Sequence, residues 1–91
     1  MNDNLLVKVL DVKKEIQTYD KIKYVRILSK KYNLLIMRDY LPIIGEIEGS
    51  IEIEGENSIK IENIKGYYMN KNNVFNLIIK EVLWVLFCTM Y

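Results

Sequence analysis

Residues 47–54 read Ile-Glu-Gly-Ser-Ile-Glu-Ile-Glu, and residues 59–62 read Ile-Lys-Ile-Glu. In both segments isoleucine alternates with charged or small residues, which is typical of a strand that buries one face and exposes the other. The intervening residues 55–58, Gly-Glu-Asn-Ser, form a cluster of turn-forming residues. The pattern therefore predicts a β-hairpin over residues 50–62 with its isoleucine face directed inward.

The same alternation with a period of two extends over most of the chain. It appears over residues 5–10 and 22–27, and the turn-forming residues 70–73 separate residues 66–69 from 74–79, which predicts a second hairpin. Short strands with turns between them predict an all-β fold, an antiparallel β-sandwich of about eight to ten short strands. The inward positions of these strands predict a core made of Val7, Val9, Ile27, Ile36, Ile51, Ile53, Ile61 and Leu77.

We expect residues 1–80 to form the sandwich domain and residues 81–91 to form an apolar C-terminal segment, either a last strand or one short helix. This segment is interrupted by Lys80 and Glu81 and is shorter than the roughly 20 apolar residues that cross a bilayer. Its large side chains add more apolar area than one sandwich covers, which predicts a partner contact. The alternative is that the segment folds over an open edge of its own domain. The predicted contact residues are Trp84, Phe87, Met90 and Tyr91.

Composition narrows the class of protein. The 91 residues suffice for one domain, and 51% hydrophobic with 27% charged residues is typical of a globular chain. The formal net charge is +1, whereas domains that neutralise nucleic-acid phosphates are usually strongly basic. Residues 1–4 are polar and lack the features of a signal peptide, so we expect a protein that is not secreted.

The inventory of reactive side chains is small. The chain has no histidine and one cysteine, Cys88, so histidine-based triads, two-histidine metal sites and internal disulfides are excluded. Cys88 has apolar neighbours and is expected to be a small buried hydrophobe. Outward-facing glutamates on solvated strands have no environment that separates their pKa values into an acid and a base. We therefore expect no enzyme, no metal and no cofactor; the glutamates concerned are Glu46, Glu48, Glu52, Glu54 and Glu62.

Tyr67 and Tyr68 lie near Lys65 and Lys71, a combination of aromatic and basic residues on which single-stranded nucleic acid can stack. Adjacent strand residues point to opposite faces, so only one tyrosine could join such a surface and the other belongs to the core.

Residues 37–41, Met-Arg-Asp-Tyr-Leu, break the alternation before Pro42, which cannot donate to a strand ladder and predicts a corner. Their mixture of apolar, aromatic and arginine side chains is enriched in protein interfaces. We expect an exposed contact loop and no active site; the alternative is a solvated turn with Met37 and Leu41 tucked inward. The predicted contact residues are Met37, Arg38, Asp39, Tyr40 and Leu41.

The order of these features resembles a known family. Residues 33–43 contain Leu34, Ile36, Met37, Pro42 and Ile43 where that family has G-E-L-G-I-L-P-G-H-A-P-L. Residues 49–53 then match its G-x-I-x-I strand, residues 66–68 its G-F-L-E-V strand, and residues 72–77 its Asn-containing turn and V-T-V-L strand. Over about residues 5–79 the chain resembles the N-terminal β-sandwich of the epsilon subunit of rotary F-type ATP synthases, called delta in mitochondria.

The departures are Tyr32 and Leu35 in place of glycines, Tyr40 in place of histidine, and Lys65 in place of a glycine. On this resemblance we expect a shortened form that lacks the family's pair of C-terminal helices. The resemblance implies a non-catalytic central-rotor subunit that docks on a gamma subunit, with residues 37–41 at the end facing the membrane ring. It implies a place on the cytoplasmic side of the plasma membrane, or on the matrix side in an organelle. The alternatives are a free-standing β-sheet adaptor and a barrel that binds single-stranded nucleic acid.

Overall fold

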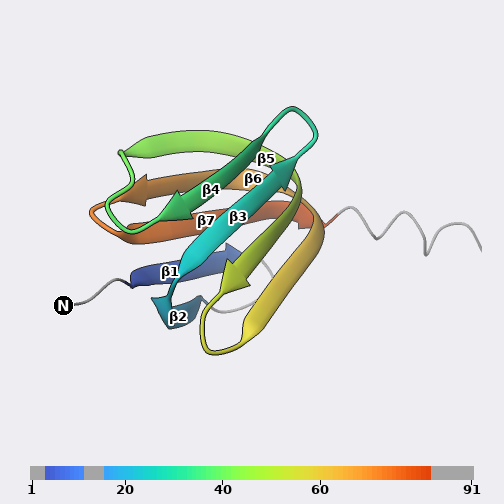
Figure 1. The fold of residues 1–91 in the computed structure, drawn as a ribbon. Coiled ribbons are helices and arrows are strands. Elements are labelled where there is room, and N and C mark those ends of the chain that lie inside the picture. The colour runs from blue at the N-terminus through green and yellow to red at the C-terminus, as the bar shows by residue number, and fades with distance from the viewer. Residues whose placement is uncertain (1–3, 12–15, 83–91) are drawn as a thin grey trace, which may run out of the picture.

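A computed structural model describes residues 4–11 and 16–82 of the chain, and these residues form an all-β fold (Figure 1). The predicted fold class is confirmed, although the strands are fewer and longer than expected. Within the described residues there are seven strands: β1 (Leu5–Asp11), β2 (Gln17–Ile22), β3 (Tyr24–Ser29), β4 (Asn33–Met37), β5 (Ile43–Glu54), β6 (Ser58–Lys71) and β7 (Val74–Val82).

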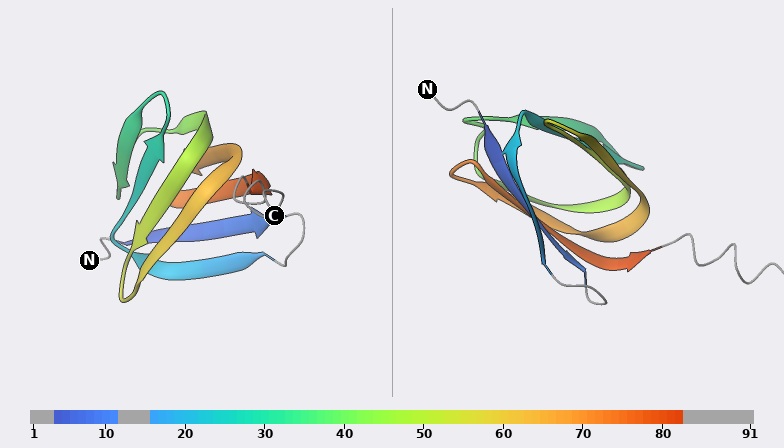
Figure 2. Two further views of the ribbon diagram at one scale, coloured as in Figure 1. Left: turned by 90° about the vertical axis from the view of Figure 1, so that its right-hand side faces the viewer. Right: turned by 90° about the horizontal axis from the view of Figure 1, so that it is seen from below.

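The strands form one sheet in the order β2-β1-β7-β6-β5-β3-β4. All neighbours are antiparallel except β1 and β7, which run parallel with Leu6 opposite Val74 and Asp11 opposite Ile79. The sheet curls strongly, as the two views in Figure 2 show, because the long strands β5 and β6 bend across the molecule. The described strands thus form one mixed, curled sheet, where two packed antiparallel sheets were expected.

Both predicted hairpins are present. Glu54 pairs with Ser58 across the β5–β6 turn, and Lys71 pairs with Val74 across the β6–β7 turn. Asn72 and Asn73 have φ angles of 51° and 63°. Positive φ at both central residues is typical of the type I′ turn, a common two-residue hairpin connection, and asparagine adopts it more readily than most residues.

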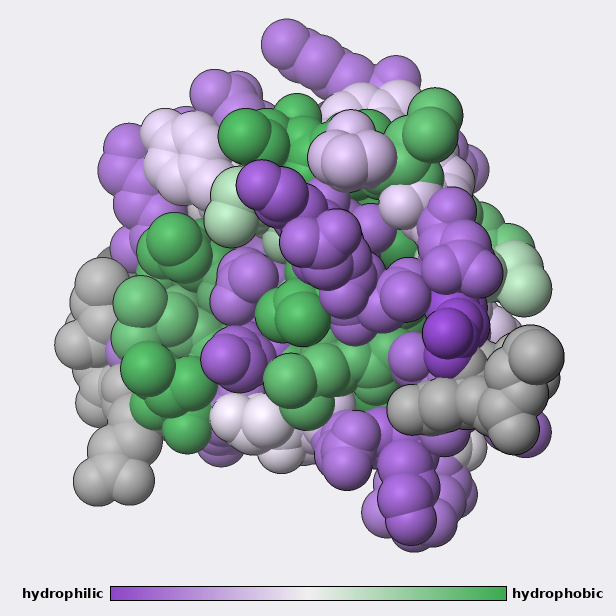
Figure 3. Space-filling view, turned by 90° about the vertical axis from the view of Figure 1, so that its left-hand side faces the viewer, coloured by the Kyte–Doolittle hydropathy of each residue, from purple (hydrophilic) through white to green (hydrophobic). Residues whose placement is uncertain are grey.

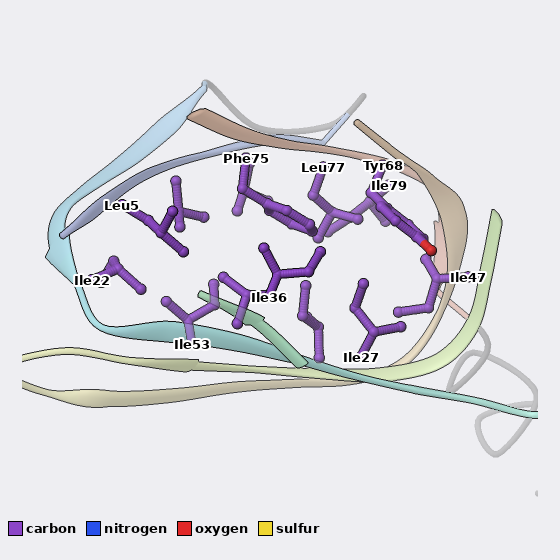
Figure 4. Close-up of a cluster of buried hydrophobic side chains, with 14 of the residues drawn as sticks. Leu5, Ile22, Ile27, Ile36, Ile47, Ile53, Tyr68, Phe75, Leu77 and Ile79 are labelled. Atoms are coloured by element: carbon purple, nitrogen blue, oxygen red, sulfur yellow. The ribbon is translucent and has the colours of Figure 1, made fainter. Parts of the chain in front are cut away.

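The core lies inside the curl. Side chains of β1, β6 and β7 point toward those of β3, β4 and β5 (Figure 4). Seven of the eight predicted core residues are buried, and the eighth, Ile61, is partly buried against the cluster. The buried hydrophobic residues are Leu5, Val7, Val9, Ile22, Val25, Ile27, Ile36, Ile47, Ile51, Ile53, Ile64, Tyr68, Phe75, Leu77 and Ile79.

A β-bulge in β6 explains why Ile64, which was not predicted to be in the core, is buried. Ile51 pairs with Ile61 and Gly49 pairs with Ile64, so β6 has one extra residue between these two pairs. Asn63 has a φ of 56° at this point. An extra residue reverses which side chains face inward, so the buried set on β6 changes from odd to even positions and Ile64 enters the core.

Candidate protein-contact surfaces

The connection between β4 and β5 is held against the β6–β7 turn. The backbone N–H of Asp39, whose φ is 66°, donates to Asn73 Oδ1 at 2.6 Å, and Asn73 Nδ2 donates to Asp39 Oδ1 at 3.4 Å. The N–H of Tyr40 donates to the carbonyl of Met37 at 3.2 Å, which closes the turn. The connection therefore has a defined shape, set by side chains that are far apart in the sequence.

This arrangement presents apolar side chains to solvent. Leu41 is 77% exposed and Met37 is 53% exposed. Asp39 is exposed, whereas Arg38 is half-buried and has its Nε 3.7 Å from Asp39 Oδ2; Tyr40 is partly buried against the core. The loop is exposed as expected, and its role as a contact remains a prediction. The other predicted contact residues, Trp84, Phe87, Met90 and Tyr91, lie outside the described residues.

A second apolar surface runs across the outer face of four neighbouring strands. The strand register places Leu10 beside Ile78 and Ile78 beside Tyr67, and it places Met69 beside Ile44. All five side chains are exposed, Ile44 at 76%. We call this set the outer stripe. Figure 3 shows hydrophobic side chains at the surface among hydrophilic ones at the end of the molecule that carries the β4–β5 connection and the β6–β7 turn.

The sequence pattern did not single out the outer stripe, but it held a signal. Residues 5–10 and 77–79 are almost continuously apolar, and a strand that is apolar on both sides is usually covered on both faces. Tyr67 and Tyr68 behave as predicted, since Tyr67 is exposed and Tyr68 is buried in the core with its ring stacked on that of Phe75.

A chain of hydroxyl groups links the core to the edge of β5. Tyr32 Oη donates to the carbonyl of Glu46 at 2.5 Å, and Tyr32 Oη lies 2.6 Å from Tyr68 Oη. Because the carbonyl can only accept, the Tyr68 hydroxyl is the donor to Tyr32. Burial, with the hydrogen bond to Tyr32, raises the pKa of Tyr68 above its ordinary value, so this hydroxyl stays protonated and works as a structural donor.

Several charged side chains of the described residues form exposed ion pairs. Lys30 Nζ lies 2.6 Å from Glu48 Oε2, and this hydrogen bond and charge lower the pKa of Glu48 below its ordinary value of 4.5. Within the part of the chain that the structure describes, no three histidine, cysteine or acidic residues gather to hold a metal ion. Nor does this part contain a helix long and apolar enough to cross a membrane.

The fold and these surfaces define a small all-β domain with exposed apolar faces. By sequence, the chain matches no protein-family model and no curated protein. By structure, it is similar to a chain in the cryo-EM structure of the Tetrahymena thermophila mitochondrial ATP synthase central stalk and c-ring, with a TM-score of 0.72 and 10% sequence identity. The similarity covers 88% of this chain and 66% of the Tetrahymena chain, and at this identity it shows the shared fold.

Proposed function

We propose that this chain is a non-catalytic, epsilon-like subunit of the central stalk of an F-type or F-type-like rotary ATPase, where it links a gamma-like subunit to the base of the rotor. The observation that carries the proposal is the structural similarity, across 88% of the chain, to a chain of an ATP synthase central stalk and c-ring. The order of sequence motifs over about residues 5–79 supports the same family independently of the structural comparison.

The exposed surfaces fit a subunit that works by contact. A stalk subunit transmits torque through the surfaces it shares with its neighbours and needs no reactive side chain. We assign the loop of residues 37–41 to the membrane ring and the outer stripe to the gamma-like subunit. Apolar side chains with an aromatic residue, such as Tyr67 in the outer stripe, are typical of the centre of a protein interface. In this proposal the protein is held at the membrane through the complex.

The proposal is tested by purifying the tagged chain from its native cells in mild detergent and identifying the co-eluting proteins by mass spectrometry. Co-elution with the large subunits of an ATPase is the expected result. Self-association alone supports the adaptor, and retained RNA or DNA supports the nucleic-acid-binding barrel; either result contradicts the stalk assignment.

Two variants test the loop within this experiment. Arg38→Ala with Tyr40→Ala is expected to reduce co-elution of the ATPase subunits while the chain keeps its β-sheet circular dichroism spectrum. The matched control, Lys60→Ala with Glu62→Ala, removes one exposed ion pair on β6, which β5 and β3 separate from β4, and is expected to leave co-elution unchanged. Unaltered assembly of the Arg38/Tyr40 variant would contradict the assignment of this loop.

We also propose that residues 82–91 contact the partner through Trp84, Phe87, Met90 and Tyr91. Burial of one large apolar side chain contributes roughly 1.5–3 kcal/mol, so several together can anchor a short segment. Truncation after Glu81 is expected to abolish partner binding with an unchanged melting temperature. A large fall in the melting temperature of the isolated chain would instead mean that the segment belongs to the core.

A further inference from the structure

Strand β5 has neighbours on both sides along only half of its length. It pairs with β3 from Gly49 to Glu54, and the pairing ends where Ser29 lies opposite Gly49. From Ile43 to Glu48 the described strands pair with it on one side only, through β6. A groove of about 700 Å³ follows this edge between the β3–β4 turn and the first half of β5.

The backbone of β5 points unpaired groups into this groove. Both backbone groups of Glu48 are hydrogen-bonded there: its N–H donates to Ser29 Oγ at 3.2 Å, and its carbonyl accepts from the N–H of Lys30 at 3.0 Å. Alternate residues of a strand direct their N–H and C=O groups to the same side. Ile44 and the N–H of Glu46 therefore face the groove as well, where no described strand pairs with them. An unpaired edge of this kind is a template for an added strand.

The side chain of Tyr32 covers part of the unpaired edge of β5. The hydroxyl of Tyr32 caps the Glu46 carbonyl and is held in place by the Tyr68 hydroxyl. Gly45 makes this arrangement possible, because a Cβ at that position would collide with the Tyr68 ring and hydroxyl. The groove thus has a wall that is fixed from the core, while its edge carries a single side-chain cap that an incoming strand can displace.

The charge of the groove indicates what it accepts. Four lysines line it, against two glutamates. Glu48 is already paired with Lys30, so the groove carries an excess of positive charge although the chain as a whole has a net charge of only +1. The lysines are Lys30, Lys31, Lys65 and Lys80.

From this geometry we infer that the groove binds an extended acidic segment of a partner protein, which adds as a strand to the free edge of Ile43–Glu48. Alternate side chains of such a segment point in opposite directions. One set meets the apolar lining at Leu34 and Ile43, and the other, acidic set meets Lys31 and Lys65. This inference rests on the groove alone and does not depend on the proposed place in a rotary ATPase.

The test is fluorescence polarisation with the purified full-length chain and a labelled hexapeptide of alternating valine and glutamate. A second probe has the same sequence with every other backbone nitrogen methylated, so it keeps the charge and loses the strand hydrogen bonds. We expect the methylated probe to bind at least about tenfold more weakly, the effect of losing a hydrogen bond or two. Equal affinity of the two probes overturns the strand addition.

The double charge reversal Lys31→Glu with Lys65→Glu is expected to lower the affinity for the unmethylated probe by about tenfold or more. The matched control Lys8→Glu with Lys23→Glu makes the same change of charge outside the groove lining and is expected to change affinity less than about threefold. Equal losses in the two variants overturn the assignment to the groove. If thermal melting shows that the variant Lys31→Glu with Lys65→Glu is unfolded, the variant Lys31→Gln with Lys65→Gln is measured in its place.

Tyr32→Phe gives a readout in the opposite direction. It removes the cap from the Glu46 carbonyl and keeps the ring, so the unmethylated probe is expected to bind as tightly as before or more tightly. Weaker binding contradicts the role of Tyr32 as a displaceable cap. Tighter binding of an oligothymidylate than of the acidic peptide, or a dimer that the Lys31/Lys65 variant dissolves, also overturns the acidic segment as the occupant.

Discussion

The two halves of β5 belong to one continuous strand, yet they have different surroundings. Gly49–Glu54 lies between β3 and β6, buries Ile51 and Ile53, and turns Glu52 outward between Arg26 and Lys60. Ile43–Glu48 has a described strand on one side only and turns Ile44 to solvent. Gly49–Glu54 is therefore paired along both of its edges, whereas Ile43–Glu48 has an exposed apolar side chain and a free backbone edge. Both halves supply the core, through Ile47, Ile51 and Ile53, but only Ile43–Glu48, which we call the available half, also offers a free edge for a contact.

The largest expected effect lies in the fully paired half. Ile53 is completely buried, so Ile53→Ala should lower the free energy of unfolding by about 2–5 kcal/mol. Ile44→Ala in the other half is the control and should change it by less than about 0.5 kcal/mol, because that side chain is exposed. Urea denaturation measures both values. Equal losses would contradict the placement of Ile53 in the core and of Ile44 at the surface.

The boundary between the halves is Gly49. Its φ is 156°, which side chains rarely adopt, and a Cβ there would meet the backbone carbonyl of Leu28. Gly49→Ala should destabilise the fold by about 1–3 kcal/mol or more, since neither the strain nor the backbone contact can relax easily. A melting temperature equal to that of the native chain would show that β3 and β5 can separate at a different residue.

Asn70 lies opposite Ile43, at the far end of the available half. Its side chain is fully buried, and neither its Nδ2 nor its Oδ1 has a hydrogen-bond partner within the described residues. Burial of such a group costs about 1–3 kcal/mol, so Asn70→Leu should raise the free energy of unfolding by about 1 kcal/mol. Asn76→Leu, on the neighbouring strand β7, should have a smaller effect. A lower stability for Asn70→Leu would show that the amide is satisfied in solution.

Loss of the hydrogen bond between the Tyr68 and Tyr32 hydroxyls, beside the groove, should have a smaller effect on the free energy of unfolding. Tyr68→Phe keeps the stacked ring and removes the donor to Tyr32, which should cost about 0.5–1.5 kcal/mol in urea denaturation. Tyr32 retains the Glu46 carbonyl as its acceptor in this variant. A loss as large as that of Ile53→Ala would contradict the minor structural role given to this hydrogen bond.

Substitution of Glu48, where β5 meets the β3–β4 turn, should have the smallest effect on stability. Its pKa is lower in the folded chain, so its contribution to stability is present above its ordinary value of 4.5 and is lost as the pH falls through the folded value. Glu48→Gln should lower the melting temperature slightly near pH 7 and not at all near pH 2. Lys30→Gln is the matched control and should show the same pH dependence.

The sequence was sufficient for the parts of the fold that depend on local alternation. Period-two patterns predicted both hairpins and the opposite orientations of Tyr67 and Tyr68, because those follow from strand geometry and turn residues. The inward position of Ile64 was missed, since the bulge at Asn63 shifts the alternation by one residue and leaves no separate signal. The pairing of β1 with β7 joins distant segments, which local patterns do not encode.

The candidate contact surfaces could be predicted from the sequence only in part. Residues 37–41 were predicted to form an exposed loop because their composition differs from that of the strands on either side. The groove depends on where β3 stops pairing with β5 and on Tyr32 reaching Glu46 and Tyr68, contacts between residues far apart in the chain. Such a site becomes visible only when the sheet is assembled.

Amide hydrogen exchange of β5, in the isolated chain and in the assembly purified with it, tests the difference between its two halves most directly. The account predicts that the amides of Ile51 and Ile53 exchange slowly in both samples. The amides of Ile44 and Glu46 should exchange rapidly in the isolated chain and become protected in the assembly. Slow exchange of Ile44 and Glu46 in the isolated chain, or no gain of protection in the assembly, would contradict the account.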